Sequence, residues 1–161
     1  MIKKNGDEKM PKIKLAKRDN YEFEYKVTLQ VTDINYGGHL GNDALVGIIH
    51  EARVNLLTTL GCSEFDLGDG KTGIIMSDLG INYLGEGFLL DELIVYSNIN
   101  EISNASFRIF HHVTKKDKTI ALAETGVIAF NYNESHIVEI PKVFLDSLNN
   151  YLDNKKEEIN D

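Results

Sequence analysis

The chain of 161 residues contains one cysteine, no tryptophan and only two prolines. The lone Cys62 cannot form a disulfide within the chain, which excludes a disulfide-stabilised secreted fold. No apolar run approaches the roughly 20 residues that cross a membrane, and the first residues hold no apolar segment typical of signal peptides. Basic residues are few, 17 against 25 acidic ones, and a net charge of −8 argues against non-specific binding to nucleic acid. We therefore expect a cytoplasmic protein without a membrane span.

The composition otherwise indicates an ordinary globular protein, with 42% hydrophobic and 26% charged residues. A chain of this length can bury one real core. The sequence shows no internal repeat and no composition shift that would mark a domain boundary. We expect a flexible arm over residues 1–19, a single domain over 20–152 and a polar tail over 153–161.

Alternation and helical spacing predict the first two elements. Residues 21–31 alternate apolar and polar side chains and predict one long strand. Apolar residues then recur at helical spacing and predict a helix over roughly 42–60. Asn42 is a good N-cap, Asp43 complements the helix dipole, and Gly61 is a plausible stop.

The rest of the chain reads mostly as strands joined by short connections. We expect strands at 72–84, 92–102, 105–114 and 118–132, and a short amphipathic helix at about 142–152. Short connections imply antiparallel neighbours, so the order favours an α+β fold with one helix against a five-stranded antiparallel sheet. One helix cannot cover five long strands, so we expect a homodimer or a dimer of dimers.

Residues that could take part in a reaction are most concentrated where the first strand leads into the long helix. The segment 33–53 combines flexible glycines with groups that move protons or donate hydrogen bonds, namely Asp33, Asn35, Gly38, His39, Gly41, Asn42, Asp43, His50, Glu51 and Arg53. Backbone N–H groups at such a helix start can stabilise an oxygen that becomes anionic during a reaction. His39 is the hardest of these residues to explain by structure alone.

The other polar residues of this segment also have structural interpretations. Asp33 could satisfy backbone N–H groups where the strand ends, and Asn35 could form a turn. Asn42 could be a cap alone, and Asp43 could only complement the helix dipole. Glu51 could belong to the solvated face of the helix, as could His50 and Arg53.

Metal and nucleotide sites find little support. Histidines are scattered, and His111 and His112 must point to opposite faces of one strand, so they cannot share a metal. Residues 68–73 fit a G-x-G-x-x-G pattern, but they follow a helix and lead into a strand, the reverse of a dinucleotide site. We expect no metal and no cofactor.

The turn and helix together resemble a known family, the hotdog-fold acyl-CoA thioesterases of the 4-hydroxybenzoyl-CoA type. The resemblance covers about residues 21–150 and rests on a D-x-[DN]-x-x-G-H-x-x-N turn followed by E-A-R on the helix. The matching positions are Asp33, Asn35, Gly38, His39, Asn42, Glu51, Ala52 and Arg53. It implies a hotdog fold, in which the five-stranded sheet wraps around one central helix.

One position departs from the family's pattern. Many members carry a second Asp that attacks the thioester or activates water, and this chain has Asn35 there. An amide has no ionisable base, although it can orient water or the thioester. The resemblance therefore implies a base elsewhere, with Asp43 and Glu51 as the leading carboxylates and His39 as the leading imidazole.

The resemblance implies hydrolysis of an acyl-CoA or acyl-carrier-protein thioester, with the helix start as oxyanion hole. Asn35, His39, Asn42, Asp43 and Glu51 are then the candidate catalytic residues. The candidate substrate-binding residues are Asp33, Gly38 and Gly41. Coenzyme A would enter as part of the substrate, and Lys115 and Lys116 are guesses for the groups that hold its phosphates. The alternative is a non-catalytic hotdog module that binds an acyl thioester or lipid; a dehydratase is weaker, because no paired His and acid motif is clear.

Overall fold

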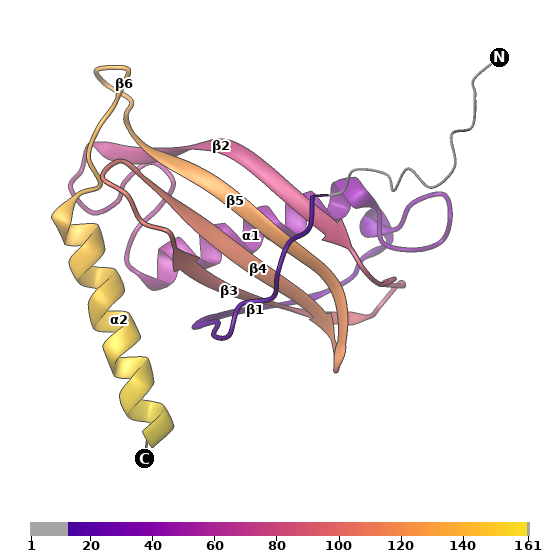
Figure 1. Cartoon of the computed structure of the whole chain (residues 1–161). Helices are drawn as coiled ribbons and strands as arrows, with labels where there is room; N and C mark the ends of the chain where they lie inside the picture. The colour runs from indigo at the N-terminus through magenta and orange to yellow at the C-terminus, as the bar shows by residue number, and fades with distance from the viewer. Residues whose placement is uncertain (1–12, 161) are drawn as a thin grey trace, which may run out of the picture.

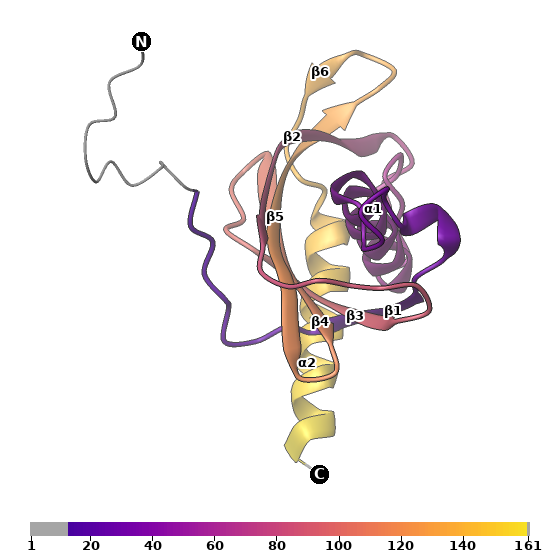
Figure 2. The same ribbon diagram turned by 90° about the vertical axis from the view of Figure 1, so that its right-hand side faces the viewer.

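The computed structural model describes residues 13–160, and the side chains of residues 13–157. An antiparallel sheet curves around one helix, α1 (Asn42–Thr59), as Figures 1 and 2 show from two sides. Its strands are β1 (Phe23–Thr28), β2 (Thr72–Tyr83), β3 (Glu92–Asn100), β4 (Ser106–Lys115), β5 (Lys118–Asn131) and the two-residue β6 (His136–Ile137). The sheet order is β1-β3-β4-β5-β2, and β6 pairs with β5. The predicted α+β architecture is confirmed, and only β6 was not expected.

The first strand is shorter than the alternating pattern predicts. β1 ends at Thr28, and a 3₁₀ turn, η1 (Val31–Asp33), follows. The Asp33 carboxylate accepts a hydrogen bond from the Gln30 N–H at 2.7 Å, which fixes the start of this turn. Val31, which the alternation places on the apolar face of that long strand, lies instead in this turn and is 74% exposed. The chain leaves the sheet early, and this brings Asp33 beside the start of α1.

The helix begins at Asn42, the residue expected to cap it, so that its N-cap lies one position earlier. Gly41 is the N-cap of α1, with extended backbone and no side-chain cap, and Asn42 is already helical. At the other end Gly61 takes φ 73°, and the Cys62 N–H donates to the Leu57 carbonyl at 2.8 Å. Only glycine takes this conformation at low cost, so the predicted stop at Gly61 is confirmed.

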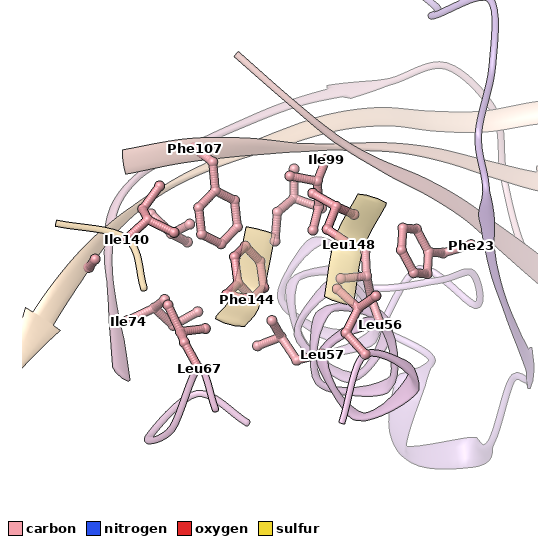
Figure 3. Packing of buried hydrophobic residues seen from close by; sticks show 14 residues of the cluster. Phe23, Leu56, Leu57, Leu67, Ile74, Ile99, Phe107, Ile140, Phe144 and Leu148 are labelled. Atoms are coloured by element: carbon pink, nitrogen blue, oxygen red, sulfur yellow. The ribbon is translucent and has the colours of Figure 1, made fainter. Parts of the chain in front are cut away.

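The core lies between α1 and the concave face of the sheet. Along β4 the side chains of Phe107, Ile109, His111 and Val113 face the helix, since alternate residues of a strand share one face. On α1, Leu45, Ile49, Leu56 and Leu57 are at most 1% exposed. Figure 3 shows the end of this core at which Phe107, Leu57 and Phe144 meet. The helix is thereby held rigidly, with its N-terminal turn at the opposite end.

The C-terminal helix, α2 (Lys142–Asn160), starts as predicted but runs beyond residue 152. Its first half packs into the core through Phe144 and Leu148, and Tyr151 stacks on Phe23 with ring centroids 4.6 Å apart. Residues 153–160, assigned to a polar tail from the sequence, continue this helix. In Figure 1 the C-terminal half of α2 extends past the edge of the sheet.

The N-terminal segment 13–20 lies against the convex face of the sheet, away from α1 (Figure 2). The Asn82 side chain donates to the Ile13 carbonyl at 2.7 Å and accepts from the Leu15 N–H at 2.8 Å. The Arg18 guanidinium lies 3.5 Å from the centre of the Phe110 ring and pairs with Glu101. The rest of the predicted arm, residues 1–12, lies outside the described residues, as does Asp161.

Candidate functional site

The segment 33–41 forms a compact turn that the surrounding backbone holds in place. The Gly41 N–H donates to the Asp33 carbonyl at 2.8 Å, and the Asn35 N–H donates to the His39 carbonyl at 2.9 Å. The Leu40 N–H reaches across to the Gly87 carbonyl at 2.8 Å, which ties the turn to the loop between β2 and β3. These three backbone hydrogen bonds, with a fourth from the Gly38 N–H to the Asn35 carbonyl at 2.9 Å, leave this turn little freedom.

Asn35 has a clear local role in this turn. Its side-chain oxygen accepts a hydrogen bond from the Gly37 N–H at 2.8 Å, an arrangement typical of asparagine in turns. Gly38 then takes φ 83°, which only glycine adopts readily. The amide at position 35 therefore shapes the turn, whatever else it does.

Asn35 and Asp43 both lie close to Gly41. A methyl group placed on Gly41 would lie 2.5 Å from the Asp43 Oδ1 atom and 3.7 Å from the Asn35 Cβ atom. Gly41 is buried and has an ordinary backbone φ of −67°, so what demands glycine here is space. The missing side chain lets the Asp43 carboxylate fold back over the cap of α1.

A hollow of 540 Å³ opens between the end of β1 and the first turns of α1. It is lined by Val27, Thr28, Gln30, Thr32, Asp33, Asp43, Ala44, Gly47, Ile48 and Glu51. We call it the carboxylate hollow, because three of the predicted site residues, Asp33, Asp43 and Glu51, line it. The first N–H groups of α1 have no partner within the helix and lie at the same place.

Tyr25 is the residue of this site that the sequence did not single out. Its hydroxyl donates a hydrogen bond to the Glu51 carboxylate at 2.7 Å, from β1 to α1. This bond, with partial burial and the Glu51 charge, raises the pKa of Tyr25 to about 12. The alternation of residues 21–31 places Tyr25 on the apolar face of the strand, but nothing local in the sequence indicates its partner 26 residues further along.

The remaining predicted residues lie around the turn and outside the lining of this hollow. The His39 ring is half-buried, with its Nε2 atom 3.1 Å from the position that a Cβ on Gly37 would occupy. Asn42 is exposed, and its carbonyl accepts a hydrogen bond from the Tyr83 hydroxyl at 3.4 Å. The structure thus groups Asp33, Asp43 and Glu51 on one side, while His39 stays on the turn.

Arg53, which could have belonged to the solvated helix face, is only 8% exposed. Its Nε atom lies 2.7 Å from a Glu64 carboxylate oxygen, and His50 pairs with the second oxygen at 3.1 Å. Partial burial acts to raise the pKa of Glu64, but the hydrogen bonds and charges of Arg53 and His50 outweigh it and lower that pKa. This cluster fastens α1 to the loop after it, away from the carboxylate hollow.

Within residues 13–160, no three His, Cys, Asp or Glu side chains gather in an arrangement that could hold a metal ion. None of the helices described there is long and apolar enough to cross a membrane.

Comparison with protein families identifies the fold and the family. The sequence profile of the thioesterase-like superfamily matches residues 29–148, which include the turn, α1 and the whole sheet after β1. The chain belongs to the thioesterase-like superfamily. The match to this thioesterase-like family does not include the N-terminal segment, β1 or the second half of α2. No curated protein matches this sequence.

Solved structures confirm the hotdog fold of this thioesterase-like chain. The 1,4-dihydroxy-2-naphthoyl-CoA thioesterase of Synechocystis is 17% identical, with a TM-score of 0.71 over 78% of this chain and 94% of its own. A gentisyl-coenzyme A thioesterase is 21% identical, with a TM-score of 0.69 over 78% and 98%. A hypothetical protein of Aquifex aeolicus reaches 25% identity and a TM-score of 0.72 over 78% and 98%.

Proposed function

We propose that this chain hydrolyses an acyl thioester, with the carbonyl group bound at the first turn of α1. The observation that carries the proposal is the carboxylate hollow, which Asp43 and Glu51 line beside the first turns of α1, where the leading N–H groups have no partner within the helix. One carboxylate would take a proton from water while that water attacks the carbonyl carbon. The oxygen becomes anionic and is stabilised by the backbone N–H groups, a kind of contact typically worth about 3–4 kcal/mol. The intermediate then expels the thiolate, which takes up a proton to leave as the free thiol.

The base is assigned to Asp43 or Glu51, because Asn35 cannot ionise and its oxygen already accepts the Gly37 N–H. Asp43 is the nearer of the two to the helix start, since it sits over the cap residue Gly41. Glu51 lies two turns further along α1 and is held by Tyr25. His39 would assist from the turn, and Asn42 would contribute its backbone N–H to the bound oxygen.

The test is release of free thiol from a panel of acyl-CoAs by the wild type, Asp43→Asn and Glu51→Gln. Loss of a general base lowers kcat by about 10²–10⁴-fold, so one variant should lose far more than the other. Asp153→Asn on the exposed part of α2 removes the same charge far from the hollow and serves as the control. Full activity in both hollow variants, with none in Asn35→Ala, would remove the carboxylates from the mechanism.

A binding module without catalysis is the second candidate, because Asn35 stands where related chains carry an acid. Asn35→Asp separates the two. If the wild type releases no thiol and Asn35→Asp does, the natural chain binds thioesters without cleaving them. If the wild type is active and Asn35→Asp is slower, the turn is adapted to an amide and hydrolysis stands.

We further propose that two copies associate through an open edge of the sheet. Among the described strands, β2 pairs with β5 along one edge only, and its outer edge carries the exposed side chains of Met76 and Tyr83. The loop before β2 takes up the start of this edge, where the Ile74 N–H donates to the Glu64 carbonyl at 2.7 Å. The rest of the edge, from Met76 to Tyr83, has no strand partner within residues 13–160 and is a ready template for a second copy. Light scattering at micromolar concentration should give the mass of a dimer, or of a dimer of dimers; a stable monomer would contradict this.

A further inference from the structure

Tyr25 joins the first strand to the carboxylate hollow. Its hydroxyl donates a hydrogen bond to the Oε2 atom of Glu51 at 2.7 Å, across the space between β1 and α1. The Tyr25 ring is half-buried and packs against the part of the core that lies under the first half of α1. Its backbone pairs with Val95 of β3, inside the paired stretch of β1. Packing and pairing therefore fix the position of this donor.

The Glu51 side chain depends on this donor for its orientation. Glu51 is exposed on α1, and within residues 13–157 only Tyr25 forms a hydrogen bond or ion pair with its carboxylate. A glutamate side chain that nothing holds occupies several rotamers, and ordering it costs conformational entropy. The bond to Tyr25 therefore decides where the Glu51 carboxylate lies.

This bond still leaves room for a reacting water. A carboxylate offers about four lone-pair sites, and Tyr25 uses one of them, on Oε2. Asp43, Gly47 and Glu51 line the carboxylate hollow at steps of four residues, which places them on one face of α1. Side chains on a helix lean toward its N-terminus, and here that is toward Gly47 and the first turn. A Cβ atom on Gly47 would meet no other atom within 4 Å, so a water beside Gly47 has space next to the Glu51 carboxylate.

A neutral donor suits a base better than a cation does. The hydrogen bond to Glu51, partial burial and the Glu51 charge raise the pKa of Tyr25 to about 12, so its hydroxyl stays protonated at neutral pH. It therefore holds Glu51 without taking a proton itself. The Nε atom of Arg53, by contrast, lies 2.7 Å from Glu64 and carries a positive charge, which opposes proton uptake by a carboxylate. A hydroxyl fixes a carboxylate at a smaller cost to its basicity.

We infer that Tyr25 is a positioning residue for the proposed hydrolysis, and that its hydroxyl holds the Glu51 carboxylate where it takes the proton of the attacking water. The inference rests on the proposed function and selects Glu51 as the base. The Asp43 carboxylate has no hydrogen-bond or ion-pair partner within residues 13–157, so no contact of this kind fixes it. As the water oxygen bonds to the carbonyl carbon, a proton passes from water to Glu51. The same proton goes to the sulfur when the carbon–sulfur bond breaks.

Tyr25→Phe tests this role, because it removes the hydroxyl and keeps the ring. The kcat for the acyl-CoA that the wild type cleaves fastest should fall about tenfold, a loss typical of a hydrogen bond to a charged group. KM should stay the same, because the lost bond holds the base and not the substrate. Tyr151→Phe is the matched control. Its hydroxyl also reaches from a helix to the chain beside β1, donating to the Glu22 carbonyl at 3.1 Å outside the carboxylate hollow, and its removal should leave kcat unchanged.

A double-mutant cycle separates positioning from a bond that only supports the fold. In Glu51→Gln no base remains to be held, so adding Tyr25→Phe should cause no further loss of kcat. In Asp43→Asn the same addition should still cost about tenfold. Equal losses in the wild type and in Glu51→Gln would overturn the inference, as would a Glu51→Gln variant that keeps its kcat.

Thiol release by the wild type separates failure of this inference from failure of the proposed function. If the wild type releases no thiol from any acyl-CoA of the panel, the proposed hydrolysis is refuted, and the positioning role with it. If the wild type releases thiol and Tyr25→Phe does so at the same rate, only the positioning role is refuted. A fall in kcat at constant KM that disappears in Glu51→Gln would support both.

Discussion

The buried imidazole of His111 should make the folding stability of this chain depend on pH. The ring is 1% exposed on the concave face of the sheet, with its Nδ1 atom 2.8 Å from the Ser97 hydroxyl oxygen. Burial, and then the charge of Arg53, lower the pKa of His111 from 6.5 to about 3. The imidazole is therefore neutral in the folded chain at any pH well above 3.

Proton linkage gives the direction and the size of the change in the free energy of unfolding with pH. Below pH 6.5 the unfolded chain takes up a proton at His111 that the folded chain refuses, so stability falls as the pH falls, until about pH 3. The loss from this one residue is about 1.4 kcal/mol at pH 5.5 and about 2.7 kcal/mol at pH 4.5, relative to pH 8. Above about pH 8 the imidazole is neutral in both states and contributes no pH dependence.

Urea unfolding of the wild type and His111→Asn, at one protein concentration, measures this effect. Asparagine can keep a polar atom near Ser97 but cannot titrate. The free-energy difference between the two proteins should shrink by about 2.7 kcal/mol from pH 8 to pH 4.5. His112, whose pKa burial also lowers, and the carboxylates titrate in both proteins and cancel. Parallel stability curves would show that the folded chain accepts a proton at His111.

Three further substitutions test the site and its support. Gly41→Ala should lower kcat at least tenfold, because the new methyl group takes the place of the Asp43 carboxylate. Circular dichroism should show that the variant is folded. An unchanged kcat would refute a role for the present position of that carboxylate. Gly47→Ala meets no atom within 4 Å and should instead raise the free energy of unfolding by about 0.5–1 kcal/mol, so a loss of stability would contradict the open space described there. Arg53→Gln leaves Glu64 half-buried without its cation and should destabilise the chain by about 2–3 kcal/mol in urea unfolding, whereas no change would show that solvent already screens the pair.

Much of the fold could be predicted from the sequence because its patterns are local. The apolar spacing along α1 and the alternation in β2 to β5 report directly which face is buried. The early end of β1 could not be predicted, because it depends on the Asp33 carboxylate and on backbone bonds to the loop before β3. The far half of α2 was missed because it has no apolar stripe, although Lys and Glu favour helices.

The sequence predicts which residues belong to the candidate site, but it does not predict which of them lie together in the folded chain. Asp33, Asp43 and Glu51 share a hollow because the turn folds back against β1, which no spacing in the sequence states. The path of the turn also places His39 outside the hollow that these carboxylates line. Tyr25 and the buried state of Arg53 arise from partners on other elements, Glu51 and Glu64, that only the folded chain brings near.

The segment 13–20 acts on the convex face of the sheet as a tethered competitor. Because it belongs to the same chain, it holds that face at an effective concentration that can reach the millimolar range, far above the micromolar concentration of free copies. Another molecule that would stack on this face must first displace Arg18 from the Phe110 ring and break both hydrogen bonds to Asn82. The Asn82 side chain, by holding the segment 13–20 in place, therefore helps to keep the convex face of the sheet covered.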